Sequence, residues 1–288
     1  DGGSMQVGSM TAFITYAMMI VMSFLMLTMM SVMLPRGSVA AKRIDEVLQT
    51  KTSVQETAQP KHLQDSKGVL TFDHVCFRYP HAEENALTDL CFTAKPNQTT
   101  AIIGGTGSGK STIAMLALRF HDANWGEVTL DGVDVRKMTQ HDLRRRVSYV
   151  QQQAWLFSGT IADNLRYGDR DASDERLNHA IDVAQAREFV DSLPQGLESR
   201  VAQGGTNFSG GQKQRLSIAR ALTGDTQLVV FDDSFSALDF KTDAALRHAL
   251  AAETNGRAVL IIAQRVSTVQ HADQIVVLSD GQVAGIGK

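Results

Sequence analysis

An apolar run of unusual length occupies the start of the chain. Residues 11–34 consist of Met, Leu, Ile, Val, Phe, Ala, Thr and Ser with one Tyr, and the first charged side chain after Asp1 is Arg36. These 24 residues are enough to span the hydrocarbon core of a bilayer with some tilt. The alternative is a buried helix of a soluble protein, which needs a polar face that Ser, Thr and Tyr supply poorly. We therefore predict a transmembrane helix.

The helical pattern continues beyond the apolar run. Ala40, Ile44 and Leu48 recur at helical spacing, so the helix is expected to extend from the bilayer to residue 48, with a kink at Pro35. Residues 1–48 are therefore predicted to form one membrane segment.

Basic residues mark the C-terminal end of this segment. Arg36, Lys42 and Arg43 follow the apolar run directly, which by the positive-inside rule places this end in the cytoplasm. Residues 49–67 are polar and predict a linker. The remainder, residues 68–288, is therefore expected to lie in the cytoplasm.

Residues 68–288 alternate short apolar runs with helical patterns. The segment VTLDGVDV at 128–135 is typical of a hairpin. Further apolar runs occur at residues 100–103, 147–150, 228–231, 259–262 and 275–278. Strands separated by helical segments predict an α/β fold with a parallel sheet, in which ligands bind at the carboxyl ends of the strands.

Polar groups follow four of these strands. They are a glycine-rich loop after residue 103, Gln152, the pair Asp232 and Asp233, and Gln264. Ordinary loop polarity would have to produce this arrangement four times over. We therefore predict a ligand site at this edge of the sheet.

The glycine-rich loop has the pattern of a phosphate-binding loop. It comprises Gly104, Gly105, Thr106, Gly107, Ser108, Gly109, Lys110, Ser111 and Thr112. Its glycines allow backbone N–H groups to point at a phosphate chain, and the following helix adds its N-terminal amides. Lys110 is predicted to hold the β- and γ-phosphates, Ser111 to ligate Mg²⁺ and Thr112 to reach the α-phosphate. The expected cofactors are ATP and Mg²⁺.

Three further side chains complete this predicted site. Asp232 is placed to hold Mg²⁺ or its water opposite Ser111, and Gln152 offers its amide oxygen to the same metal. Tyr79 ends a strand-like segment upstream of the loop, where its ring could stack on adenine. The alternative for Tyr79 is an ordinary structural aromatic.

Composition and charge limit the classes of binding partner that the chain is expected to have. The 288 residues carry a net charge of −3, and the short basic run at 144–146 is typical of a helix end, so no nucleic-acid partner is expected. The two cysteines, Cys76 and Cys91, lack zinc-ligand spacing. We expect both to be reduced packing residues in a cytosolic environment.

A second string, NFSGGQKQR at 207–215, makes the pattern specific. With it the chain resembles a half-transporter of the ATP-binding cassette (ABC) exporter family. The matching positions are Tyr79 for adenine stacking, 104–112 for the Walker A loop, Gln152 for the Q-loop, Phe208, Ser209, Gly210, Gly211 and Gln212 for the LSGGQ signature, 228–232 for Walker B, and Ser236 and Asp239 for the D-loop.

The resemblance implies a fold and a location. It predicts a P-loop NTPase of the ABC type at 68–288, with a RecA-like core, an antiparallel β subdomain and a helical subdomain at about 153–222, preceded by one transmembrane helix. One helix cannot form a transport pathway, so we expect a chain truncated at its N-terminus. The full-length protein is expected to be a multi-pass protein of the cell membrane with its ATP-binding domain in the cytoplasm.

The resemblance also implies a partner. In this family two cassettes pack head to tail, so that the signature of one chain completes the ATP site of the other. Ser209, Gly210 and Gly211 open a helix whose N-terminal amides can face a γ-phosphate. A second ABC half-transporter subunit and the lipid bilayer are therefore expected partners, and small amphipathic compounds the expected transport substrate.

Two positions depart from the family pattern. Asp233 stands where the family usually has the Glu that activates the attacking water, and Gln264 stands where it usually has the switch His. The shorter carboxylate withdraws the base by about 1.5 Å, and a glutamine cannot become cationic. We expect a transport ATPase whose own Walker site is slow, similar to the degenerate subunit of heterodimeric exporters of the bacterial multidrug type.

Two alternatives stay open at this point. A homodimeric exporter could use Asp233 as its base despite the shorter reach. A soluble P-loop phosphotransferase, with the apolar N-terminus as a buried helix, is the other alternative, although the signature string argues against it.

Overall fold

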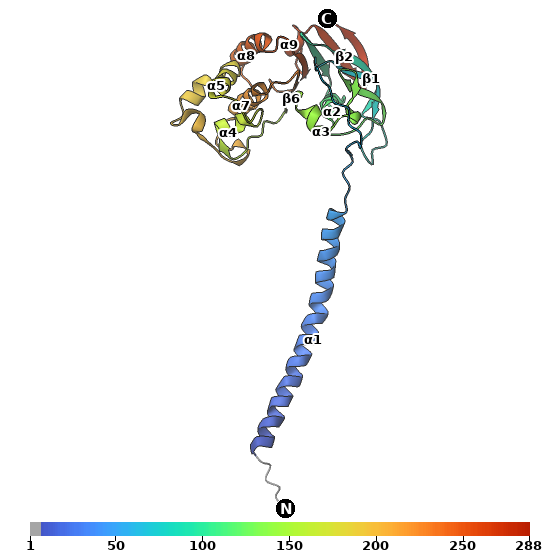
Figure 1. The fold of residues 1–288 in the computed structure, drawn as a ribbon, viewed down its shortest axis with the longest axis vertical. Coiled ribbons are helices and arrows are strands. Elements are labelled where there is room, and N and C mark those ends of the chain that lie inside the picture. The colour runs from blue at the N-terminus through green and yellow to red at the C-terminus, as the bar shows by residue number, and fades with distance from the viewer. Residues whose placement is uncertain (1–6) are drawn as a thin grey trace, which may run out of the picture. The chain divides into compact units, whose positions relative to one another are not determined.

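The computed structural model describes residues 7–288 and divides the chain into two compact units, one ending at Ser53 and the other beginning at Val54 (Figure 1). The first six residues of the predicted membrane segment 1–48 lie outside the described residues.

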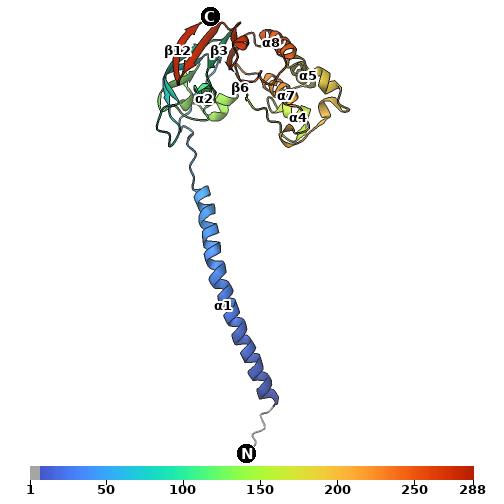
Figure 2. The same cartoon turned by 180° about the vertical axis from the view of Figure 1, so that it is seen from behind.

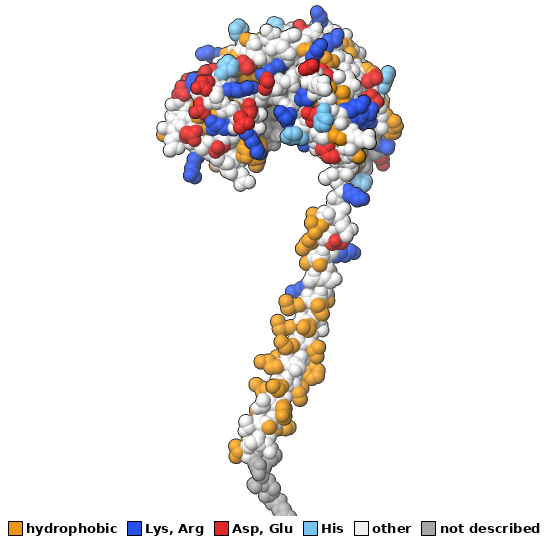
Figure 3. Space-filling view, viewed as in Figure 1, with side chains coloured by type: hydrophobic (Ala, Val, Ile, Leu, Met, Phe, Trp, Pro, Cys, Tyr) orange, Lys and Arg blue, Asp and Glu red, His pale blue; other side chains and the backbone are white. Residues whose placement is uncertain are grey.

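The first unit is a single helix, α1 (Val7–Leu48), which runs continuously through Pro35. Apolar side chains cover its exposed surface (Figure 3), and its mean hydropathy reaches 2.2, so by length and composition it could cross a membrane. Five of its hydroxyl groups are satisfied within the helix, because each of the five donates to the carbonyl four residues earlier. These residues are Thr11, Thr15, Ser23, Thr28 and Ser31.

The second unit is built around a six-stranded sheet in the order β12-β11-β3-β10-β9-β6. Its strands are β3 (Gln98–Gly104), β6 (Val147–Val150), β9 (Leu228–Asp232), β10 (Ala258–Ala263), β11 (Gln274–Ser279) and β12 (Gln282–Gly287). The first five are parallel to one another, and β12 is antiparallel to β11. The predicted α/β fold with a parallel core is confirmed. The strand β12 was not predicted.

Three helices follow strands of this sheet. They are α2 (Lys110–Ala117) after β3, α8 (Phe240–Glu253) after β9 and α9 (Val266–Val269) after β10. Every residue of β9 is buried, which is why its sequence reads as an unbroken apolar run.

A four-stranded antiparallel sheet in the order β2-β1-β4-β5 completes the core. Its strands are β1 (Leu70–Phe77), β2 (Leu87–Ala94), β4 (Trp125–Leu130) and β5 (Val133–Asp134). The predicted hairpin is the β4–β5 pair, in which Thr129 faces Asp134. The stacked rings of Phe72 and Phe92, 4.8 Å apart, join β1 to β2 on the buried side.

Between β6 and β9 the chain is mainly helical. The helices are α4 (Ile161–Arg166), α5 (Asp174–Val183), α6 (Arg187–Asp191) and α7 (Gly210–Thr223), with a small pair of strands, β7 (Gly159–Thr160) and β8 (Arg200–Val201). A short helix, α3 (Gln140–Arg144), precedes β6. Helices α4, α5 and α7 gather at the end of this unit away from β12 (Figure 2).

Candidate functional site

One pocket of about 340 Å³ lies at the carboxyl ends of β3, β9 and β10. Its lining brings together residues predicted from five separate stretches of sequence. These are Tyr79, Thr106, Gly107, Gly109, Lys110, Ser111, Thr112, Gln152, Asp232, Asp233 and Gln264, together with Ala86 and Ile262. The residues that mark the ends of the parallel strands therefore share one site.

The glycine-rich loop wraps around the ammonium group of Lys110. The Lys110 Nζ donates to the carbonyl oxygens of Gly104 and Gly105 at 2.9 and 2.6 Å, and it lies 3.4 Å from the Ser108 Oγ. Only 8% of Lys110 is exposed. A buried ammonium held over a loop of backbone amides is suited to exchange these carbonyls for anionic oxygens.

Gly109 is required by both conformation and space. Its φ is +93°, and an added Cβ would lie 2.7 Å from the Leu87 Cδ2 and 2.8 Å from the Ala86 carbonyl oxygen. A side chain here would strain the backbone and push β2 away from the loop.

We expect Gly109→Ala to lower the free energy of unfolding by about 1–3 kcal/mol, the usual cost of a strained backbone position, and to weaken ATP binding. Gly105→Ala is the matched control, since no atom lies within 4 Å of its added Cβ. Chemical unfolding of the full chain measures both variants. Equal losses of stability would contradict this explanation.

Asp232 is the most buried carboxylate of the pocket, with 3% exposure. Its Oδ1 accepts a hydrogen bond from the Ser111 Oγ and its Oδ2 one from the Tyr149 hydroxyl, both at 3.1 Å. Burial raises the pKa of Asp232, while these two hydroxyls oppose that rise. Hard oxygen donors at this separation fit Mg²⁺, which prefers carboxylate, hydroxyl and water ligands.

Tyr149 was not predicted as a site residue. It lies on β6 opposite Val230 of β9, and Val230 is two residues before Asp232 on the same strand. Burial, followed by the charge of Asp232, raises the pKa of Tyr149, so the phenol stays a neutral donor. Only the register between β6 and β9 reveals this contact, because nothing in the local sequence marks it.

The two departures from the family pattern lie in the same pocket. Asp233 has a left-handed backbone with φ +44°, and its N–H donates to the Ile262 carbonyl at 2.8 Å. The Gln152 Nε2 donates to the Asp233 Oδ2 at 3.2 Å, which leaves the Gln152 amide oxygen outside this contact. Gln264 is exposed at the rim.

Tyr79 lines the pocket beside the start of α2. Its hydroxyl lies 3.0 Å from the Thr112 Oγ1, and its ring packs edge-on against Phe77 and His121 at 4.8 and 5.5 Å. His121 was not predicted, and it supports the position of the tyrosine ring.

The predicted signature residues lie elsewhere. Ser209 caps α7 through a capping box, in which its Oγ accepts from the Gln212 N–H and the Gln212 side chain accepts from the Ser209 N–H. Phe208 packs against Phe189. In the part of the chain described by the structure, none of the signature residues lines the pocket, and the exposed Gly210 has nothing within 4 Å of an added Cβ. This helix end faces outward.

The predicted D-loop residues have local partners. The Ser236 Oγ donates to the Asp233 carbonyl at 2.9 Å. Asp239 caps α8, with its carboxylate accepting from the Thr242 N–H at 3.0 Å. Neither residue belongs to the pocket lining.

Comparison with known proteins gives a consistent result. A sequence model of the ABC transporter family matches residues 87–236. The chain is 45% identical over 291 residues to an uncharacterised ABC transporter ATP-binding protein of Mycobacterium tuberculosis, covering 100% of this chain and 50% of that protein. It is 39% identical over 281 residues to an ATP-dependent lipid A-core flippase of Haemophilus ducreyi, covering 97% and 48%.

A solved structure is also similar over nearly the whole chain. It is that of a bacterial Atm1-family ABC exporter with ATP bound, with a TM-score of 0.84 and 32% identity, covering 98% of this chain and 49% of that one. The chain therefore spans about half the length of the relatives it matches.

Proposed function

The chain belongs to the ABC transporter family, and from that membership we propose that it is the ATP-binding half of an exporter subunit that moves small amphipathic compounds across a membrane. In this proposal α1 spans the bilayer and leads into the ATP-binding unit. Relatives named as lipid A-core flippases support an amphipathic cargo. Family membership leaves no place for the soluble phosphotransferase alternative.

Each group of the pocket has a role in holding nucleotide. Lys110 would exchange the Gly104 and Gly105 carbonyls for phosphate oxygens, and Tyr79 would stack on adenine. Ser111 and Asp232 would hold Mg²⁺, which when bound neutralises the charge on the phosphates. Tyr149 fixes the second oxygen of Asp232, so that the carboxylate presents one defined face to the metal.

We further propose that this site binds ATP but cleaves it slowly. The observation that carries this proposal is that Asp233 and Gln264 line the same pocket as Lys110 and Asp232. Both departures therefore fall at the end of the site where a γ-phosphate and its attacking water would lie. A base displaced by about 1 Å can cost on the order of 10²-fold in rate.

The combination of a slow Walker site and an intact signature in one chain leads us to propose a heterodimer. The signature helix α7 is intact and its capped N-terminus is exposed, so it is available to a second half-transporter. That partner would supply a Walker B Glu and a switch His, and this chain's Ser209 and Gly210 would complete the partner's site.

One contact favours a second candidate function, the homodimeric exporter. The Gln152 side chain donates to the Asp233 carboxylate at 3.2 Å, which keeps that carboxylate directed into the pocket as an acceptor. In this candidate Asp233 serves as the base in two equivalent sites.

Single-turnover hydrolysis by the purified full-length protein, alone and with its partner, separates the two candidates. A degenerate subunit alone should hydrolyse ATP at least about 10²-fold more slowly than the pair. Ordinary exporter rates from the protein alone, abolished by Asp233→Asn, would establish the homodimer instead.

Ser209→Ala tests the role of the signature in trans. In the assembled transporter we expect hydrolysis at the partner's site to fall by about 10²-fold, as for loss of one transition-state donor, while this chain's own ATP affinity stays unchanged. Ser173→Ala is the control, because the Ser173 side chain also caps a helix, α5, by accepting from the Arg176 N–H, but belongs to no signature. An equal effect of both substitutions would reduce Ser209 to a helix cap.

A further inference from the structure

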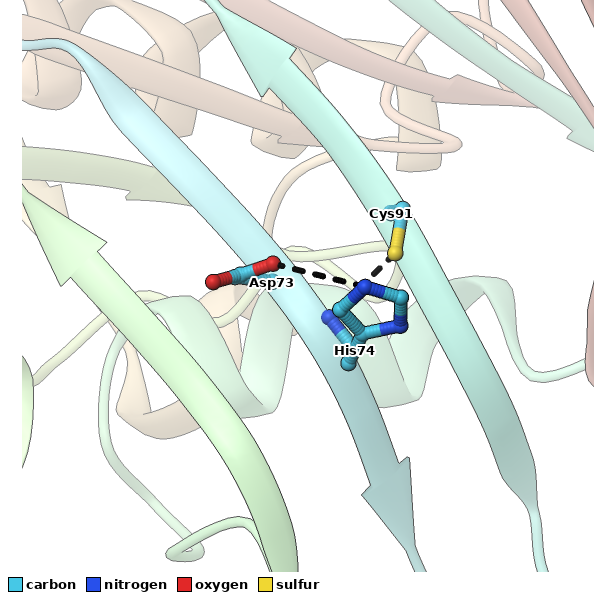
Figure 4. A group of neighbouring side chains, drawn as sticks. All are labelled: Asp73, His74 and Cys91. Atoms are coloured by element: carbon cyan, nitrogen blue, oxygen red, sulfur yellow. Dashed lines mark hydrogen bonds and ion pairs between the residues drawn. The ribbon is translucent and has the colours of Figure 1, made fainter.

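A group of metal-binding side chains lies on the exposed side of the β1–β2 pair, away from the pocket lining. One oxygen of Asp73, one ring nitrogen of His74 and the Cys91 Sγ all lie within 4.8 Å of one another (Figure 4). Asp73 and His74 are well exposed, with side-chain exposures of 68% and 74%, and Cys91 is half-buried and unpaired in any disulfide. Three different ligand types therefore converge on one point.

A β-bulge creates this convergence. Neighbouring residues of a strand normally point to opposite faces, but the β1–β2 register jumps between Phe72 and Val75. Asp73 and His74 are consequently both exposed, and His74 takes a left-handed φ of +48°. Bulges of this kind redirect side chains at functional positions.

The neighbouring strand accommodates the bulge with a glycine. An added Cβ at Gly126 of β4 would lie 2.2 Å from the His74 carbonyl oxygen. A side chain at Gly126 is thus incompatible with the backbone that places His74 beside Asp73.

Asp89 of β2 orients the imidazole. The His74 Nδ1 lies 2.6 Å from the Asp89 Oδ1, which leaves Nε2 as the free nitrogen, 4.0 Å from the Asp73 Oδ1. A histidine that binds a metal through one nitrogen usually donates its other N–H to a carboxylate. Such a second partner is already in place.

The surroundings carry an excess of negative charge. Asp73 lies directly opposite Glu127 of β4 in the strand register, and like charges across a strand pair are unfavourable without a cation. The carboxylate of Asp89 lies beside the His74 ring as well. These acidic side chains together make a site that attracts a cation.

We propose that Asp73, His74 and Cys91 bind a single Zn²⁺ ion, with Asp89 as the positioning residue for the imidazole and water as the fourth ligand. A thiolate, an imidazole and a carboxylate suit Zn²⁺ and are unsuited to Mg²⁺ or Ca²⁺. Zn²⁺ replaces the thiol proton of Cys91, which passes to solvent, so the affinity rises with pH. The ligand atoms lie up to 4.8 Å apart, so binding requires the exposed side chains of Asp73 and His74 to rotate toward the Cys91 sulfur.

Calorimetric titration of the full chain with ZnCl₂, without nucleotide or affinity tag, tests the proposal. We expect one Zn²⁺ per chain, and the chain loaded with Co²⁺ should show thiolate-to-cobalt charge-transfer absorption. Cys91→Ser and His74→Gln should each weaken binding by at least about 10-fold, and Asp89→Asn by about 10–100-fold through the ring orientation. Saturating Zn²⁺ should raise the Tm of the ATP-binding unit by several degrees.

Two controls make the result decisive. Cys76→Ser removes the other thiol of the same strand pair, outside the three-ligand group, and should leave the affinity unchanged. Asp232→Asn alters the nucleotide pocket and should also have no effect. The proposal is overturned if no stoichiometric binding occurs, if Cys76→Ser and Cys91→Ser weaken it equally, or if Asp232→Asn abolishes it. A circular-dichroism melt of each variant excludes misfolding as the cause.

Discussion

Replacing Asp233 by Glu together with Gln264 by His should raise ATP hydrolysis at this chain's own Walker site by about 10³-fold. Glu extends the carboxylate by one methylene toward the attacking water, and recovering about 1 Å of reach is worth on the order of 10²-fold. His can donate as a cation to the γ-phosphate, and a transition-state donor is worth about 10²–10³-fold. The two gains act on one transition state, so we expect less than their product.

In the proposed heterodimer, quench-flow single turnovers with the partner's site inactivated would measure this gain. Each single substitution should give part of it. Asp225→Glu with Gln270→His repeats the same chemical changes at exposed positions and should give no gain in the rate of hydrolysis. An unchanged rate in a double variant that still binds ATP would show that the two departures do not limit hydrolysis.

Asp233→Glu should also carry a cost in stability. Position 233 has φ +44°, and Asp tolerates the left-handed region better than Glu. We expect the free energy of unfolding to fall by up to about 1 kcal/mol, with no comparable loss for Gln264→His. Denaturant melts of the two single variants therefore separate the backbone effect from the catalytic one.

Lys110→Ala should lower the affinity for ATP by about 10²-fold or more. A charge-assisted hydrogen bond contributes about 1.5–3 kcal/mol, and Nζ already makes two bonds to the loop, to Gly104 and Gly105. Under the proposed function both bonds would be exchanged for phosphate oxygens, and we expect this ammonium to be the largest single contributor to phosphate binding. Alanine removes the charge and leaves the loop carbonyls without their donor.

Equilibrium binding of ATP without Mg²⁺ isolates this contribution from that of Asp232. Lys95→Ala is the matched control. Lys95 is exposed, and its replacement removes the same charge outside the pocket. An affinity within about threefold of the unaltered protein would show that the loop amides, and not Lys110, dominate phosphate binding.

The sequence predicted the parts of the fold whose chemistry is local. The buried strands β3, β9 and β10 appear as continuous apolar runs because both of their faces are covered. The glycine-rich loop is equally visible, since its glycines and Lys110 are adjacent in the chain. Four polar strand ends then indicated one pocket, and all four contribute to its lining.

The antiparallel sheet was harder to predict for a physical reason. The exposed pair Asp73 and His74 interrupts the alternation along β1, so the period of two that marks a half-buried strand is lost. The sequence does not indicate Tyr149 as a site residue, because its hydrogen-bond partner, Asp232, is 83 residues away. Contacts set by strand register have no local signature.

The left-handed backbone at Asp233 also makes the two departures unequal in evolutionary terms. Asp suits this conformation better than Glu, so a change from Asp to Glu at position 233 is opposed by backbone strain. Gln264 is not among the left-handed residues and meets no such barrier. Among descendants of this chain, a histidine at 264 should therefore arise more readily than a glutamate at 233.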